Sequence, residues 1–292
     1  MTKAKTSKSR TVLILVIATL CALAIAGLII RSLGYRYIKT DYAKFNGWTK
    51  DGVPTSGSIR YADGISGKLT TEKETGELII VYSTGDVYKG DFKGVVRDGL
   101  GVIEYSNGDV YDGDFKDDKR TGNAVISYAD GSSYIGEVVD GIPHGKGIYT
   151  FSDSSWYYGD FENGLKHGVG EYHDADGSYY YGSFDKDLKH GSETVTIQLY
   201  DRSEYKGKCK LVFSSGSTYV GDFVKDKRTG RGVYTWSSGE RYDGEFKNGV
   251  FEGTGSYYFS GDTTPAYTGI FKDGKIQDDT VAVIEDAPDN EQ

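Results

Sequence analysis

The chain has 292 residues, and its 41 glycines and 25 tyrosines against only 4 prolines and 1 methionine favour short strands and tight turns. Seven of its 34 Lys and Arg residues lie among the first 40 residues, which hold no acid, so residues 41–292 carry 27 bases against 43 acids. The resulting net charge of −16 argues against nucleic acid or anionic lipid headgroups as ligands of this main body, because both are bound through Lys and Arg.

The first 30 residues combine a basic segment, residues 1–10, with an apolar run, residues 11–30, that contains no charged residue. Twenty such residues would span about 30 Å as a helix, so we predict a transmembrane helix. A removed signal peptide is the alternative, because Ala24-Ile25-Ala26 offers a cleavage site, but the run continues to Ile30 and favours a retained anchor. The basic segment favours a cytoplasmic N-terminus and a single-pass protein whose remaining residues are extracytoplasmic, although Arg31, Arg36 and Lys39 oppose this orientation.

Three further regions follow the apolar run. Residues 31–64 are predicted to be a juxtamembrane stalk with a degenerate first hairpin, and residues 65–275 to be an array of repeats. Residues 276–292 form an acidic tail with few aromatic residues, which we expect to be frayed.

A tyrosine-led motif recurs along the array with a 23-residue period, and a repeat of this kind determines the fold class. In Tyr111–Phe115 the alternation has period two, which predicts a strand, and dipeptides such as Asn163-Gly164 predict a two-residue hairpin turn before a second strand. We therefore predict an all-β fold, an elongated single-layer antiparallel meander of about eight or nine hairpins. The lead tyrosines are Tyr88, Tyr111, Tyr134, Tyr157, Tyr180, Tyr219, Tyr242 and Tyr267.

The full frame is Tyr-x-Gly-x-Phe followed by Gly-x-Gly at the eleventh and thirteenth positions after the tyrosine. With this frame the chain resembles MORN-repeat proteins (membrane occupation and recognition nexus), although Ala124 and Glu193 replace the second glycine and Val138 replaces the phenylalanine. The resemblance implies lipid association, which the acidic charge of the array disfavours. The repeat glycines are Gly90, Gly99, Gly113, Gly122, Gly136, Gly145, Gly159, Gly168, Gly221, Gly230, Gly244 and Gly253.

The period fails once, between Tyr180 and Tyr219, where the gap of 39 residues is 16 longer than one repeat. We predict an irregular insertion near residues 191–209 that contains an extra hairpin. The half-motif Tyr205-Lys206-Gly207 would then place Cys209 where other repeats have phenylalanine. Function is expected at this break and along the anchor more than in the motif itself.

Two polar columns invite a metal hypothesis. His144, His167 and His190 share one repeat position, but neighbouring positions lie about 9–10 Å apart, too far for one ion. A solvated face is the simpler interpretation of the acids three residues after each lead tyrosine, with docking of a basic partner as the alternative. No metal and no cofactor are expected. These acids are Asp91, Asp114, Glu137, Asp160, Asp222 and Glu245.

The aromatic face has two interpretations. The lead tyrosines, joined by Trp156 and Trp236, pack as the core of a single-layer sheet, or they line a groove for an extended ligand. No catalytic motif is present, so we predict a non-enzymatic, membrane-anchored scaffold that binds an unknown protein partner or itself. A binding or processing module for cell-surface polymers or lipid headgroups, using the aromatic groove, is the alternative.

Overall fold

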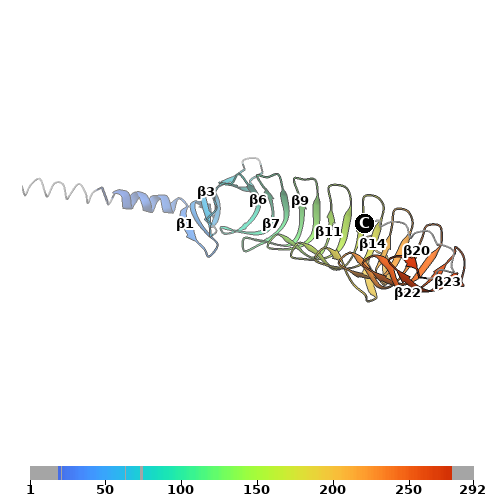
Figure 1. The fold of residues 1–292 in the computed structure, drawn as a ribbon. Coiled ribbons are helices and arrows are strands. Elements are labelled where there is room, and N and C mark those ends of the chain that lie inside the picture. Colours follow the sequence, from blue (N-terminus) through green and yellow to red (C-terminus); the bar gives the residue numbers. More distant parts are fainter. Residues whose placement is uncertain (1–18, 21, 63, 73–74, 278–292) are drawn as a thin grey trace, which may run out of the picture. The chain divides into compact units, whose positions relative to one another are not determined.

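The computed structural model describes residues 19–20, 22–62, 64–72 and 75–277. These residues divide into two compact units, with the boundary between Lys119 and Arg120. In the first unit each strand pairs antiparallel with the next along the chain (Figure 1). Its strands are β1 (Tyr35–Lys39), β2 (Ala43–Lys50), β3 (Val53–Tyr61), β4 (Ser66–Thr71), β5 (Leu78–Tyr82), β6 (Val87–Lys93), β7 (Val96–Glu104) and β8 (Val110–Lys116).

The second unit is also an antiparallel meander, so the prediction of an all-β fold built from successive hairpins is confirmed. One hairpin, β16–β17, forms a separate two-stranded sheet. The strands are β9 (Lys119–Ser127), β10 (Ser133–Val139), β11 (Ile142–Thr150), β12 (Trp156–Glu162), β13 (Leu165–His173), β14 (Tyr179–Asp185), β15 (Leu188–Lys189), β16 (Val195–Gln198), β17 (Glu204–Gly207), β18 (Lys210–Val212), β19 (Thr218–Val224), β20 (Lys227–Thr235), β21 (Arg241–Lys247), β22 (Val250–Tyr258), β23 (Tyr267–Lys272) and β24 (Lys275–Ile276).

The N-terminal part of the described chain is helical at residues 19–20 and 22–32. Within the described residues no helix combines the length and the apolar character that crossing a membrane requires, so the predicted transmembrane helix is not found there. Residues 11–18 and 21 of that prediction lie outside the described residues, as do the basic segment 1–10 and residues 278–292 of the acidic tail.

Residues 31–64, where we expected a stalk and a degenerate hairpin, contain three strands of the first unit's sheet. Phe45 on β2 and Ile59 on β3 are 0% and 1% exposed, and they face each other across the strand pair. Gly47 and Gly57 oppose one another in the same pair, as the repeat glycines do elsewhere. A phenylalanine and an isoleucine therefore fill the core position that tyrosine fills in later repeats. For this reason the tyrosine-led motif does not match this hairpin.

The two-residue turns follow the predicted geometry. Asn163 and Gly164 between β12 and β13 both have positive φ, 52° and 84°, and Asp140 and Gly141 between β10 and β11 do as well. These are the values that Asn-Gly and Asp-Gly tolerate in tight hairpins.

The core of each repeat is a tyrosine ring lying over a pair of facing glycines. Tyr157 is fully buried, and its hydroxyl donates to the carbonyl oxygen of Asp160 at 2.9 Å. Gly159 on β12 faces Gly170 on β13, and an added Cβ on Gly170 would lie 2.6 Å from the Tyr157 ring. The absence of side chains at both glycines is what allows the ring to lie against the backbone.

Phenylalanines close the core between repeats. The Tyr157 ring meets Phe161 of its own repeat at a centroid distance of 5.1 Å and Phe184 of the next repeat at 4.9 Å, both edge to face. Tyr180 repeats the arrangement with Phe184 and Phe223. Tyr157 and Tyr180 are thus each held by two phenylalanines, and the core of the second unit lies on one face of its sheet. We call this the inner face.

The acid column has a structural role that the interpretation as a solvated face did not include. The strand pair β12–β13 has a register shift beside Asp160, and Gly168 adopts a φ of 58° there. The Asp160 carboxylate accepts the backbone N–H of Val169 at 3.0 Å. Asp91, Glu137 and Glu245 accept the equivalent N–H groups of their repeats. The acids therefore hold the bulge that the first glycine of Gly-x-Gly creates.

The predicted insertion interrupts a strand at this bulge. β15 ends at Lys189, and the same strand position resumes as β18, which pairs with β14 through Tyr180 and Leu211. Continuing that register by one residue places Cys209 opposite Gly182. Cys209, and not Glu193, therefore stands where other repeats have the second glycine, which corrects the expectation that Cys209 replaces a phenylalanine. The residues between form the hairpin β16–β17.

Candidate functional site

The inserted hairpin β16–β17 lies against the outer face of the second unit, which is the face opposite the lead tyrosines. Tyr200, in the turn of the hairpin, contacts Trp156 and Tyr158 of β12, each at a centroid distance of 5.6 Å. Tyr205 of β17 contacts Tyr181 of β14 at 5.3 Å. The hairpin thus covers three neighbouring strands and makes one repeat region unlike the rest.

Beneath the hairpin lies an aromatic stack across strands. His173 on β13 is paired with Trp156 on β12 and with Tyr179 on β14. Its ring lies 4.0 Å from the Trp156 ring, with the planes 7° apart, and 5.4 Å from the Tyr179 ring. Together with Tyr158, Tyr181, Tyr200 and Tyr205, these three residues form what we call the outer patch.

A carboxylate lies at the centre of the outer patch. Glu171 on β13 is only 3% exposed, and its Oε2 lies 3.1 Å from Nε2 of His173. Its Oε1 accepts the backbone N–H of Tyr200. Burial, followed by the negative charge of Glu171, raises the pKa of the Tyr181 hydroxyl to about 12, so this group stays neutral near pH 7. The hydrogen bond from the Tyr200 N–H to the buried Glu171 carboxylate holds the inserted hairpin against the sheet.

Replacing Glu171 by alanine is expected to release the hairpin without unfolding the sheet. The Tyr200 N–H loses a charged acceptor, a change that costs about 1–3 kcal/mol in buried sites. Because β16–β17 forms a separate sheet, the loss is local. Amide hydrogen exchange in residues 195–207 should become about 5- to 150-fold faster. Glu204→Ala, an exposed acid of the same hairpin, is the control; equal exchange in the two variants would contradict this role of Glu171.

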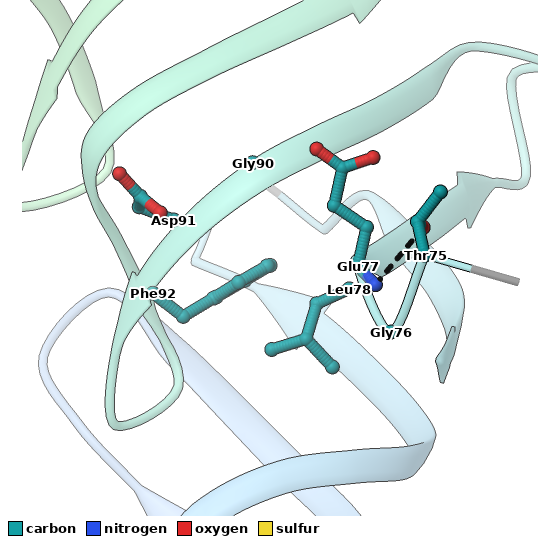
Figure 2. Close-up of a pocket in the computed structure, with 7 residues that line it drawn as sticks. All are labelled: Thr75, Gly76, Glu77, Leu78, Gly90, Asp91 and Phe92. Carbon is teal, nitrogen blue, oxygen red and sulfur yellow. Dashed lines mark hydrogen bonds between the residues drawn. The ribbon is translucent and has the colours of Figure 1, made fainter. Parts of the chain in front are cut away.

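A separate cavity of about 310 Å³ opens in the first unit (Figure 2). Residues 75–78 line one side and residues 90–92 the other. Leu78 and Phe92 supply the apolar wall, while the Asp91 carboxylate accepts the N–H of Leu100 at 3.0 Å. Glu77 and Asp91 are the ionisable residues of its lining.

The structure places the sequence-predicted aromatic residues on two faces. Trp156 lies on the outer face, because it directly precedes Tyr157 in β12 and successive residues of a strand alternate. Trp236 lies beside Tyr234 and Tyr257 on the inner face. The seven lead tyrosines of the predicted groove are each 0–1% exposed, so their rings pack as core; they are Tyr88, Tyr111, Tyr134, Tyr157, Tyr180, Tyr219 and Tyr242.

The histidine column does not gather around one point. His167 approaches Glu162 at 3.5 Å and Asp185 at 3.7 Å, both at the exposed edge of its hairpin. Among the residues that the structure describes, no group of three or more His, Cys, Asp or Glu side chains could hold a metal ion.

The outer patch was missed by reasoning on the motif, although the sequence contains a signal for it. Only the repeats led by Tyr157 and Tyr180 have aromatic residues on both sides of the lead tyrosine, in Trp156-Tyr157-Tyr158 and Tyr179-Tyr180-Tyr181. Alternation puts the flanking rings on the face away from the core. Two adjacent hairpins with an aromatic outer face, directly before the break in period, mark the surface that the insertion covers.

Comparison with known proteins identifies the repeats. A family model described as the MORN repeat matches residues 88–110, 111–133, 134–156, 157–179, 219–241 and 242–264, slightly less than half of the 292 residues. The chain therefore contains six MORN repeats. The unmatched stretch between the fourth and fifth matches is the repeat that the inserted hairpin interrupts. No curated protein matches the chain.

Two solved structures illustrate the distant similarity of this fold to known proteins. The TCP domain of SAS-4 (dCPAP) from Drosophila melanogaster, solved with a proline-rich motif of Ana2 (dSTIL), is 14% identical. The match covers 60% of this chain and 95% of that one with a TM-score of 0.30. The TCP10 domain of CPAP from Danio rerio is 9% identical, with 81% and 100% covered and a TM-score of 0.32. At these TM-scores the matches support no further conclusion.

Proposed function

We propose that this chain is a non-enzymatic scaffold, tethered to a membrane by residues 11–30, whose repeat sheet presents the inserted hairpin to a protein partner. The observation that carries the proposal is the outer patch with its hairpin, because among the residues that the structure describes it occurs once in an otherwise repeating sheet. A regular array offers the same surface at every repeat, so a partner has no preferred register on it. The hairpin β16–β17 would give a partner one defined binding position on the sheet.

The chemistry of the patch favours a basic partner segment. The main body carries a net charge of −16, and Tyr200 at the top of the patch is 60% exposed. Guanidinium and ammonium groups stack on exposed tyrosine and tryptophan rings and are attracted by an acidic surface. Burial of the lead tyrosines in the core argues against a polymer-binding groove built from them. The twenty uncharged residues at positions 11–30 support the tether.

The test uses the full chain in the membranes of cells that express it. A photoreactive phenylalanine at position 200 should give one discrete adduct, and the adduct protein should co-purify with the intact chain. Deleting residues 193–208 removes the 16 extra residues and joins Ser192 to Cys209, which restores the period, and co-purification should cease. Alkaline carbonate should leave the chain in the membrane.

The matched control places the photoreactive residue at Phe259, which is 54% exposed and lies outside the outer patch. No adduct is expected there. If the protein cross-linked at position 200 co-purifies equally with the chain that lacks residues 193–208, the hairpin is not the binding surface.

A further inference from the structure

The inner face of the second unit carries a row of cations above its aromatic core. Lys166, Lys189 and Arg228 occupy one repeat position, opposite the repeat phenylalanine across each hairpin. The Lys166 ammonium lies 5.0 Å from the centre of the Tyr172 ring, and Lys189 lies 5.7 Å from that of Tyr180. Arg228 lies 5.3–5.9 Å from four rings. We call these three residues the cation column.

Two members of the column lack a close counter-ion. Within the described residues, no carboxylate oxygen comes within 4.0 Å of the ammonium nitrogen of Lys166 or Lys189. Asp187 and Asp226 accept the backbone N–H groups of Lys166 and Lys189 instead, at 2.8 and 2.7 Å. In the first unit, by contrast, Arg97 pairs with a carboxylate at 3.1 Å.

Burial lowers the pKa of both lysines, because the aromatic walls remove water from the charged ammonium groups. A desolvated cation without a paired anion raises the free energy of the folded protein. An anion bound beside it is therefore stabilised more than it would be next to a fully hydrated cation on the open surface. The column with its rings is therefore suited to an extended ligand that alternates acidic and apolar side chains.

The chain itself contains such a segment. Residues 278–292 hold six acids, no Lys or Arg, and an apolar run at residues 281–284. This segment begins two residues after Ile276, which has the same repeat position as the cation column. Ile276 is paired with Phe271, just as Lys166 is paired with Phe161 and Arg228 with Phe223. The acids are Asp278, Asp279, Glu285, Asp286, Asp289 and Glu291.

The distances permit contact. The bridge between Gly191 and Phe223 places β15 beside β19. Along the sheet, Lys189 on β15 therefore lies six strand positions from Ile276 on β24, and Lys166 on β13 lies eight positions from it. At a strand spacing of about 4.8 Å these separations are about 29 and 38 Å. An extended chain covers about 3.3 Å per residue, so Glu285 reaches about 30 Å from Ile276 and Asp289 about 43 Å.

We propose that the inner face of the second unit, at the cation column and its rings, binds residues 278–292 of the same chain. Glu285 and Asp286 lie against Lys189, and Asp289 and Glu291 against Lys166, while the apolar run lies over the rings nearer to Ile276. The inference is independent of the outer patch, because it concerns the opposite face of the sheet.

Zero-length carbodiimide cross-linking of the full chain tests the contact. Amide links should form between residues 285–291 and the side chains of Lys166 and Lys189. A mixture of light and isotopically heavy chains should show that the links lie within one chain. Links no more frequent than those to the exposed turn residues Lys186 and Lys225, or links only between chains, would overturn the proposal.

A second readout uses matched charge variants. Lys166→Gln with Lys189→Gln should make cleavage of the full chain after Glu285 by a glutamate-specific protease at least fivefold faster. Lys186→Gln with Lys225→Gln removes the same charge from the adjacent turns and should leave the rate unchanged, with circular dichroism checking the fold of both. Equal cleavage rates in the two double variants would exclude the cation column as the site that holds this segment.

Discussion

A variant that lacks Ser133–Ser155, one full period, will fold as a shorter sheet, whereas one that lacks only Tyr134–Ser155 will lose the sheet that follows. The two variants differ by a single serine. The first joins Ser132 to Trp156, and the second joins Ser133 to Trp156.

The reason is the pairing register. Tyr134 pairs with Ile126, and Tyr157 pairs with Tyr149, which lies one period after Ile126. Removing the full period therefore lets Tyr157 pair with Ile126 in the native register. The shorter deletion puts Trp156 in that place and turns Tyr157 and every later core residue to the outer face. Each aromatic ring lost from the core costs about 3–5 kcal/mol, so the remaining hairpins cannot compensate.

Far-ultraviolet circular dichroism and thermal melting of the full chain with each deletion test whether the sheet after the deletion still folds. The full-period deletion should keep a cooperative transition within a few degrees of the intact chain, because stacked repeats contribute nearly equal increments of stability. The shorter deletion should show a reduced strand signal and no comparable transition. Indistinguishable spectra and melting curves for the two would mean that the tyrosine register does not determine the core.

Much of the fold follows from local sequence because each repeat is built from short-range geometry. The alternation in Tyr157–Phe161 predicts a strand, and Asn163-Gly164 predicts the turn, and both are confirmed by the pairing of β12 with β13. The contacts that close the core also recur at one period, so reading one repeat correctly describes its neighbours.

The rest depends on contacts that sequence spacing does not reveal. Asp160 was interpreted as part of a solvated face, but its carboxylate holds the N–H of Val169, since the bulge at Gly168 brings that group towards it. Cys209 was misplaced because the half-motif Tyr205-Lys206-Gly207 was aligned with the start of a repeat, whereas the chain leaves the strand β15 in its middle and returns to it as β18. Glu171 gave no signal on its own, because its importance comes from the hairpin folded over it.

Gly136→Ala is expected to destabilise the second unit by about 3 kcal/mol, the upper end of the cost of overpacking. Gly136 on β10 faces Gly147 on β11. An added Cβ would lie 2.5 Å from the Cα of Gly147 and 2.6 Å from the carbonyl oxygen of Lys146, which are backbone atoms held by the ladder of strand hydrogen bonds. Neither atom can move aside without separating the two strands.

The second glycine of the repeat is under a weaker constraint, which explains where this chain departs from the motif. A Cβ on Gly147 would meet ring atoms of Tyr134 at 2.5–2.6 Å, and a ring can shift within its pocket. This is the position at which the chain carries Ala124 and Cys209, whereas every lead tyrosine is followed two residues later by glycine. In the pair Gly136 and Gly147, the first glycine is therefore required by the backbone of the opposite strand, whereas the second is required only by the tyrosine side chain.

Gly131→Ala is the matched control for Gly136→Ala, because it separates steric overlap from backbone conformation. Gly131 has a φ of 90° and open space, the nearest heavy atom to an added Cβ being 3.9 Å away, so its substitution should cost only about 1 kcal/mol through the left-handed conformation. Urea denaturation of the full chain measures both free energies of unfolding. A loss at Gly136 no larger than that at Gly131 would show that the facing strands can separate to admit a side chain, and the close approach of paired glycines would then not be what selects glycine after each lead tyrosine.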